Sequence, residues 1–166
     1  MELQPSLTGE LISLRPLRAD DFESLYACAS DPKIWELHPQ PTRYLREVFQ
    51  KYFDSGIESR GALVVLDRAT SEIAGSSRYY DYDASKRQVT IGYTFLACKY
   101  WGGRYNGELK KLMLDHAFRF VDVVLFEVGE NNLRSRRAVE KLGAVLVQSR
   151  VLDGKPQVVY RLAKPA

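Results

Sequence analysis

The sequence predicts one α/β domain, built on a mixed and mostly antiparallel sheet with helices on its faces. Apolar residues alternate with a period of two in several short stretches and recur every three or four residues in others, so strands and helices interleave. The segment 88–120 passes directly from a strand pattern through a glycine-rich turn into a helix pattern. A chain of 166 residues, 45% of them hydrophobic, is long enough to bury a single core spanning residues 1–166.

Composition narrows the classes of function. The formal net charge is only +3 and no run of five Lys or Arg residues occurs, so we expect no nucleic-acid partner. The N-terminus does not resemble a signal peptide and no stretch is long enough to span a bilayer, so we expect a cytoplasmic protein without a membrane partner. Cys28 and Cys98 lack a C-x-x-C pair or a histidine at metal-ligand spacing, which predicts buried reduced thiols and no metal site.

The first half of the chain supplies one strand and two helices. Residues 11–15 alternate like a strand that stops at Pro16, because proline cannot donate a ladder hydrogen bond. Helical spacing then runs from Phe22, after a capping Asp20 or Asp21, to the break at Asp31-Pro32. A second helical pattern extends from Tyr44 to Gly56, after a proline-rich loop that contains His38. Two helices therefore precede the next strand.

Three consecutive strands are predicted at residues 63–66, 73–82 and 88–97. Polar turns at 67–72 and 81–86 separate them, and such short polar connections are typical of hairpins. We expect these three strands to form an antiparallel meander.

The most informative stretch is the turn Trp101-Gly-Gly-Arg-Tyr-Asn-Gly-Glu108 and the helix pattern that starts at Asn106. A strand, a glycine turn and a helix in succession direct unpaired backbone N–H groups and the positive end of a helix dipole at one point. This arrangement suits an anion such as a pyrophosphate. An ordinary tight connection is the alternative, because paired glycines occur in turns of many kinds.

The C-terminal part adds a strand at 123–128, a helix after Asn132 and a closing hairpin. Gly143 follows the last apolar residue of the helix, where a left-handed glycine commonly ends a helix. The hairpin pairs 145–152 with 158–162 around the turn Asp153-Gly154.

The start of this helix carries a second group of polar residues. Asn132 and Ser135 are three positions apart and share a face, so both could bind a ligand. Alternatively, Asn132 is only the N-cap and Ser135 bonds locally. Arg134, Arg136 and Arg137 oppose the helix dipole, which favours a nearby anion. Solvation or pairing with Glu140 would explain the same arginines.

Taken together, these residues resemble the signature segments of the GNAT superfamily of acyl-CoA N-acyltransferases, in the branch of ribosomal-protein alanine acetyltransferases (RimJ/RimL-like). The matching segments, in chain order, are Ile12–Leu17, Asp31-Pro32, Ile91-Gly92-Tyr93, Trp101-Gly102-Gly103 with Tyr105, Asn132-Leu133-Arg134-Ser135 and Glu140-Lys141-Leu142-Gly143. The resemblance covers nearly the whole chain in the right order.

The resemblance implies that acetyl-CoA binds between two splayed parallel strands, residues 88–97 and 123–128. Its pyrophosphate would lie on the glycine turn, and its pantetheine arm would pair with the end of the first strand and contact Asn132. Ser135 matches a hydroxyl that stabilises or protonates the departing CoA thiolate. The residues predicted to bind acetyl-CoA are Phe95, Leu96, Ala97, Trp101, Gly102, Gly103, Arg104, Tyr105, Asn106, Gly107, Asn132, Arg136 and Arg137.

The chain departs from the family pattern at two places that matter. Arg104 stands where glycine is usual, and Asn106 replaces a small residue. A non-glycine residue is costly at positive φ, so either Arg104 strains the loop or Gly103 takes over that conformation and frees Arg104 to contact phosphate. Thr90 stands where an acidic residue often precedes Ile-Gly-Tyr, which leaves the general base open.

The predicted function is transfer of an acetyl group to a primary amine, either a protein N-terminal α-amine or a small-molecule amine, by direct attack. The alternative is a non-catalytic acyl-CoA-binding module. Ser135 and Tyr93 are the predicted catalytic acids. A water chain, followed by Glu127 or Glu36, is the predicted base. Trp35, Glu36 and His38 are predicted on the acceptor side, and the protein is expected to be a monomer or a homodimer.

Overall fold

The computed structural model describes residues 1–166 and confirms the α/β fold class. Eight strands form one sheet in the order β1-β2-β3-β4-β5-β6-β8-β7. Their bounds are β1 Leu7–Thr8, β2 Ile12–Pro16, β3 Ala62–Asp67, β4 Ile73–Asp83, β5 Gln88–Leu96, β6 Val123–Gly129, β7 Val145–Leu152 and β8 Lys155–Ala163. All neighbours are antiparallel except β5 and β6, which run parallel. β3, β4 and β5 form the predicted meander.

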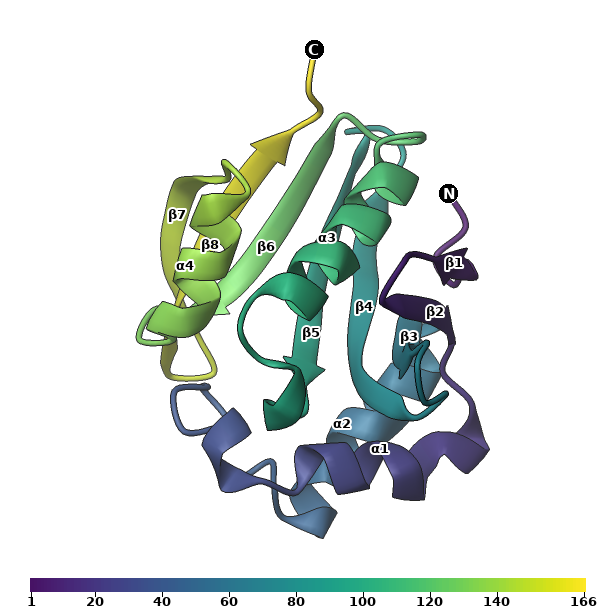
Figure 1. Ribbon diagram of the computed structural model, residues 1–166. Helices are drawn as coiled ribbons and strands as arrows, with labels where there is room; N and C mark the ends of the chain where they lie inside the picture. Colours follow the sequence, from purple (N-terminus) through teal and green to yellow (C-terminus); the bar gives the residue numbers. More distant parts are fainter.

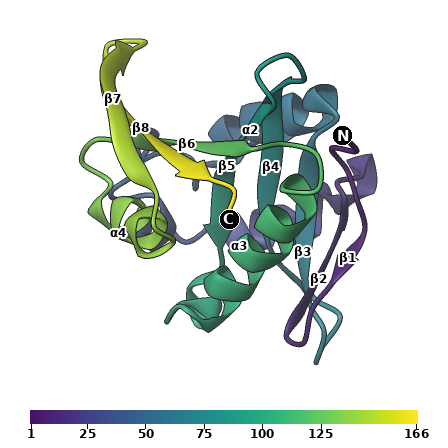
Figure 2. The same ribbon diagram turned by 90° about the horizontal axis from the view of Figure 1, so that it is seen from above.

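Four α-helices cover the two faces of the sheet (Figures 1 and 2). They are α1 Phe22–Ala29, α2 Arg46–Ser59, α3 Arg104–Ala117 and α4 Leu133–Lys141. One core, which includes Leu109 and Met113 of α3, lies under α3 and α4. The other, which includes Phe49 and Phe53 of α2, lies under α1 and α2. Two separate cores follow from strands that alternate their apolar side chains between the two faces.

The parallel pair β5 and β6 is joined over only part of its length. Pairing runs from Gln88 and Val123 to Ile91 and Phe126, although β5 continues to Leu96. Figure 1 shows the two strands diverging toward their carboxyl ends. At the same place β5 has a bulge against β4, because Arg78 pairs with Gly92 while Ser76 pairs with Phe95. The bulge bends β5 away from β6, as an extra residue in one strand does.

Several predicted boundaries shift for identifiable reasons. β2 includes Pro16, which pairs with Leu63 at the last position of the strand. The second helix begins at Arg46 rather than Tyr44 and continues past Gly56. A Cβ at Gly56 would lie 3.1 Å from both Arg78 and Leu17, so this glycine permits close packing rather than ending the helix. The short edge strand β1 has too little periodicity to be predicted.

The opposite edge strand is the most exposed part of the sheet. β7 presents Val145, Val147 and Val151 to solvent, each more than half exposed. None of the four α-helices has the length and apolar composition that crossing a bilayer requires.

Candidate active site

The glycine turn forms an open cradle at the start of α3. Gly102 and Gly103 have φ of +117° and +99°, and a Cβ at either would meet no atom within 4 Å. The strained conformations therefore fall on glycines, and Arg104 begins the helix as its first residue. No side chain caps α3, and its first intrahelical bond is Gly107 N–H to Gly103 O at 2.8 Å. The N–H groups of Arg104, Tyr105 and Asn106 are therefore available to an anion.

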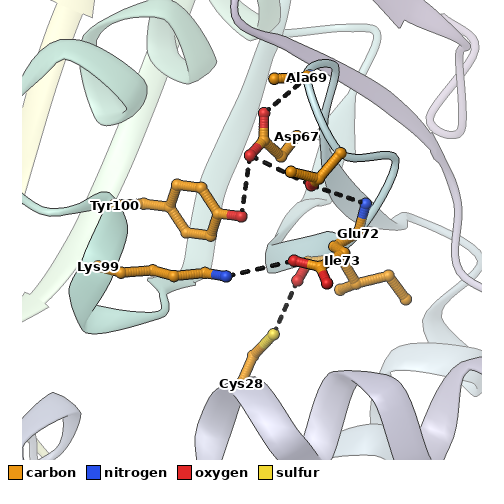
Figure 3. A network of polar contacts seen from close by, with 8 residues as sticks. Cys28, Asp67, Ala69, Glu72, Ile73, Lys99 and Tyr100 are labelled. Carbon is orange, nitrogen blue, oxygen red and sulfur yellow. Dashed lines mark hydrogen bonds and ion pairs between the residues drawn. The ribbon is translucent and has the colours of Figure 1, made fainter.

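A polar network holds the segment that leads into this cradle (Figure 3). Tyr100 Oη donates to Asp67 Oδ2 at 3.1 Å, and Lys99 Nζ lies 3.2 Å from Glu72 Oε2. Cys28 Sγ donates to the Ile73 carbonyl at 2.9 Å. The network joins residues 98–100 to the β3–β4 hairpin loop, so the position of the cradle is fixed by the sheet.

The indole of Trp101 lies beside two cations from distant segments. Arg134 of α4 stacks on the ring at 4.1 Å, and Lys33 lies 5.6 Å from it. Trp101 Nε1 donates to the Leu96 carbonyl at 3.0 Å, and Arg134 also pairs with Glu36 at 3.6 Å. These contacts bring the glycine turn, the start of α4 and the loop after α1 together at the carboxyl ends of the central strands β5 and β6.

The start of α4 lies at the carboxyl end of β6, as predicted. Asn132 is the N-cap, because its side chain accepts the Ser135 N–H at 3.3 Å. The side-chain amide N–H groups of Asn132 remain free to donate to a ligand. Arg136 makes internal bonds: its Nε donates to Tyr160 Oη at 2.9 Å and its Nη1 to the Glu130 carbonyl at 3.0 Å. Arg137 is exposed. Glu140 pairs with Arg136 through the Tyr160 hydroxyl, which donates to it at 2.6 Å.

Tyr93 occupies the bulge of β5 with a φ of +54°, which is unusual for a bulky residue. Two residues hold it there: Tyr52 Oη donates to the Tyr93 carbonyl at 2.7 Å, and the Arg78 guanidinium stacks on the Tyr93 ring at 3.8 Å. The side chain is 41% exposed on the α2 face of the sheet. Strain that is maintained by surrounding contacts is typical of functional sites.

Glu127 lies on β6 on the same face as Tyr93. Its carboxylate accepts Tyr80 Oη at 3.1 Å and pairs with Arg150 at 2.6 Å, and its side chain is 19% exposed. The Tyr80 ring packs edge-on against Tyr93 with centroids 5.3 Å apart. Burial, reinforced by the Glu127 charge, raises the pKa of Tyr80. Tyr80 therefore stays protonated and donates to Glu127.

The loop before α2 carries Trp35 and His38, which were predicted on the acceptor side. Trp35 is only 2% exposed, and its indole donates to the Ala29 carbonyl at 2.8 Å. The Arg43 guanidinium stacks on the Trp35 ring, 5.2 Å from its centroid, so the ring helps to hold this cation in position. Burial, together with the positive charges of Arg43 and Lys155, lowers the pKa of His38 to about 3. His38 is therefore neutral at pH 7.

The sequence patterns did not single out Lys110, although it falls on the apolar face of α3. It is 6% exposed, and its Nζ donates to Thr94 Oγ1 at 2.8 Å. Thr94 Oγ1 lies 2.8 Å from Ser77 Oγ, and the Lys110 ammonium is 5.7 Å from the Phe126 ring. Thr94 follows the bulge and Phe126 ends the paired part of β6, so Lys110 bridges the two strands where they separate. In the sequence, only its helical spacing from Met113 and Leu114 could have indicated that Lys110 is buried.

Replacing Lys110 with methionine is expected to stabilise the protein at pH 7. Burial lowers the pKa of Lys110 to about 8, so folding carries a cost of about 3 kcal/mol below that pH. The cost disappears as pH rises from about 8 to the unfolded value near 10.4, so the advantage of the variant should shrink over that window. Urea denaturation between pH 6.5 and 10 measures it. Lys111→Met is the matched control, since Lys111 is exposed on the same helix. A variant less stable than wild type at pH 7 would contradict this account.

The two cysteines differ from the prediction of buried thiols. Both are free and only partly buried. Burial raises the pKa of each thiol, and Cys98 Sγ donates to Asp31 Oδ2 at 3.4 Å. Their side chains bond to oxygens at the ends of neighbouring elements, which keeps them at the edge of the core.

Comparison with known proteins agrees with this geometry. The family model described as "Acetyltransferase (GNAT) domain" matches residues 12–145. The crystal structure of a GCN5-related N-acetyltransferase from Brucella melitensis is 20% identical with a TM-score of 0.81, covering 96% of this chain and 79% of that chain. A GNAT-family acetyltransferase from Bacillus anthracis is 16% identical with a TM-score of 0.78, covering 96% and 98%.

A third similar structure is the Microcin C7 self immunity acetyltransferase MccE in complex with acetyl-CoA and AMP. It is 18% identical with a TM-score of 0.74, covering 98% of this chain and 99% of that chain. At such identities the structures establish the shared fold. No curated protein matches this sequence. Because the family model spans most of the sequence, the chain belongs to the GNAT family of acetyltransferases.

Proposed function

We propose that this protein transfers an acetyl group from acetyl-CoA to a primary amine by direct attack of the amine. The observation that carries the proposal is the separation of β5 from β6 beyond Ile91 and Phe126. The separation opens a gap in the sheet between the α3 side, where the glycine cradle lies, and the α2 side, where Tyr93 and Glu127 lie. A thioester entering from one side can then meet an amine entering from the other.

The residues at the carboxyl ends of β5 and β6 fit acetyl-CoA. The N–H groups at the start of α3 would bind the pyrophosphate, with Arg104 free to add a charge-assisted contact. Ala97 N–H donates to the Ala74 carbonyl at 2.9 Å, and alternate residues of an antiparallel ladder face the same neighbour. The backbone N–H of Leu96 is therefore directed toward the gap, where it would bind the pantetheine arm or the thioester carbonyl, between Phe95 and Ala97. Asn132 would donate its side-chain N–H groups to the same arm.

Acetyl-CoA supplies an acetyl group activated as a thioester. The acceptor enters as an ammonium ion, and Glu127 receives one of its protons so that the neutral nitrogen can bond to the acetyl carbon. The carbon–sulfur bond breaks, and the second proton of the nitrogen is passed to the sulfur. Ser135 or Tyr93 hydrogen-bonds the sulfur as it leaves. The Leu96 N–H polarises the carbonyl while these changes occur.

Thiol release from acetyl-CoA, measured against a panel of amines, tests the proposal. We expect release that depends on the amine and matches the amount of N-acetyl product detected by mass spectrometry. Tight binding of acetyl-CoA without product from any peptide or small amine would favour a non-catalytic acyl-CoA-binding module instead.

A glycine substitution tests the cradle separately. Gly103→Ala is expected to weaken CoA binding about tenfold, because positive φ is costly for alanine and the α3 N–H groups move. Gly143→Ala is the matched control, since Gly143 has a similar φ of +90° and equally open surroundings at the end of α4. Both variants should lose similar stability, and only Gly103→Ala should lose affinity in calorimetry with CoA. Equal affinity in the two variants would place the pyrophosphate elsewhere.

A further inference from the structure

A cavity lies on the acceptor side of the sheet, next to the bulge of β5. It has a volume of about 320 Å³ and is lined by residues that include Gln40, Arg43, Lys51, Tyr52, Ser55 and Tyr93. Its two charged lining residues are both cations, Arg43 and Lys51. Arg78 adds a third positive charge behind it, stacked on Tyr93 at 3.8 Å and on Tyr52 at 5.7 Å. Glu127, on the far side of Tyr80, is already paired with Arg150.

Arg43 is half-buried and has no carboxylate partner. Its guanidinium is stacked on Trp35 at 5.2 Å and on Tyr52 at 4.9 Å, so its position is fixed by two rings. Burial lowers the pKa of Arg43, and the charge of Arg78 acts in the same direction. A cation held this way, without an ion pair, is costly unless something else neutralises it.

The ring of His38 presents a second hydrogen-bond donor beside Arg43. His38 Nδ1 accepts the Gln40 backbone N–H at 2.9 Å, so in the neutral ring the proton resides on Nε2. Arg43 Nη1 lies 3.5 Å from that Nε2. Two donors therefore lie side by side at the cavity. An anionic oxygen placed beside them would accept from both.

We propose that the acceptor amine belongs to a molecule that also carries a carboxylate or a phosphate, and that Arg43 and Lys51 bind this anionic group in the cavity. The inference rests on the proposed acetyl transfer and names the class of its second substrate. The amine would extend from the anionic group past Tyr52 and Tyr93 toward Glu127, along rings whose centroids are 6.2 Å apart for Tyr52–Tyr93 and 5.3 Å apart for Tyr93–Tyr80. The same charges disfavour polyamines and other polycations.

Matched acceptor pairs test the inference. O-phosphoethanolamine is compared with ethanolamine, β-alanine with β-alaninamide, and the peptide Ala-Ala-Asp-amide with Ala-Ala-Asn-amide, each corrected for its fraction of free amine. We expect kcat/KM to favour the anionic member of at least one pair by about tenfold, the size of a charge-assisted contact. The preference should weaken at high ionic strength, because one contact comes from the exposed Lys51. The three pairs distinguish a phosphate, a free amino acid and an acidic peptide as the source of the anion.

Substitutions of the two cations test whether they produce the preference for anionic acceptors. Arg43→Gln should abolish the tenfold preference for the anionic member and Lys51→Met should reduce it severalfold, each measured as the ratio of kcat/KM for the two members within one variant. Arg46→Gln is the matched control, because Arg46 also stacks on two rings, Phe22 at 5.4 Å and Tyr26 at 4.8 Å, but lies outside the cavity. Lys51→Met serves alone if Arg43→Gln fails to fold, since Lys51 is exposed and belongs to neither core.

Calorimetry with the same compounds gives a readout that does not require turnover. Anionic compounds should bind the CoA-loaded protein more tightly than their neutral partners, and Arg43→Gln should abolish the difference. Acetylation of both members of every pair at equal kcat/KM would overturn the inference and leave the proposed function standing. Binding of the anionic compounds through Arg43 without acetylation of any would support the cavity assignment and refute the proposed function.

Discussion

Glu127→Gln is expected to lower kcat/KM at pH 7 about 100-fold, a typical contribution of a positioned general base. An α-amine has a pKa near 8 and is mostly protonated at pH 7, so a group must remove its proton before attack. Glu127 is the half-buried carboxylate on the proposed acceptor face, oriented by Tyr80 and Arg150. Glutamine keeps the size of the side chain and can still accept from Tyr80, but it cannot take the proton.

The pH dependence separates this role from a structural one. Above about pH 9 the amine is neutral without assistance, so the defect of Glu127→Gln should shrink steadily as pH rises. Glu36→Gln is the control, because Glu36 is an exposed carboxylate that pairs with Arg134. Initial rates from pH 6.5 to 9.5, with thermal melting to confirm folding, measure both variants. Full activity of Glu127→Gln at pH 7 would assign proton removal to a water chain instead.

Glu108→Ala is expected to destabilise the protein by about 3 kcal/mol, because three backbone N–H groups lose their acceptor. The Glu108 carboxylate projects from the second turn of α3 and accepts the N–H groups of Glu10, Leu11 and Ile12 at 2.9, 2.8 and 2.8 Å. It therefore fastens the β1–β2 turn to the helix that begins at the glycine cradle. For a domain of this size the loss corresponds to a melting temperature lower by about 6–12 °C.

Acidification should remove the stabilisation that the Glu108 carboxylate provides. Burial by itself raises the pKa of Glu108, but the three N–H groups outweigh it and the net pKa is lowered. The stabilisation is therefore complete above the unfolded pKa near 4.3 and is lost as pH falls through the lower native value. Urea denaturation of wild type, Glu108→Ala and Glu108→Gln from pH 3 to 7 should show the gap closing on acidification. Glu23→Ala should cost much less, because its ion pair with Arg46 is exposed to solvent. A loss at Glu108 no larger than at Glu23 would contradict the prediction.

Local patterns in the sequence determined the order of the elements and the glycine cradle. The succession of strand, glycine turn and helix at 88–120 is a short-range property, and only glycines can adopt φ near +100° at low cost, so Gly102 and Gly103 take those positions. The sequence left open whether Arg104 strains the loop. The structure places it inside α3, where a non-glycine residue is unstrained.

The arrangement of residues on the proposed acceptor side was decided only by the tertiary structure. Periodicity indicates which side of an element is buried but does not identify its neighbour. The strained φ of Tyr93 depends on Tyr52, 41 residues away, and the cavity beside it combines the loop before α2 with β5. In the sequence, Lys110 is one charged residue in a helical pattern. In the fold, its buried ammonium group is hydrogen-bonded to Thr94, 16 residues away. The glycine turn needs no distant partner to form, whereas the charges around the acceptor acquire their roles from packing between segments far apart in the chain.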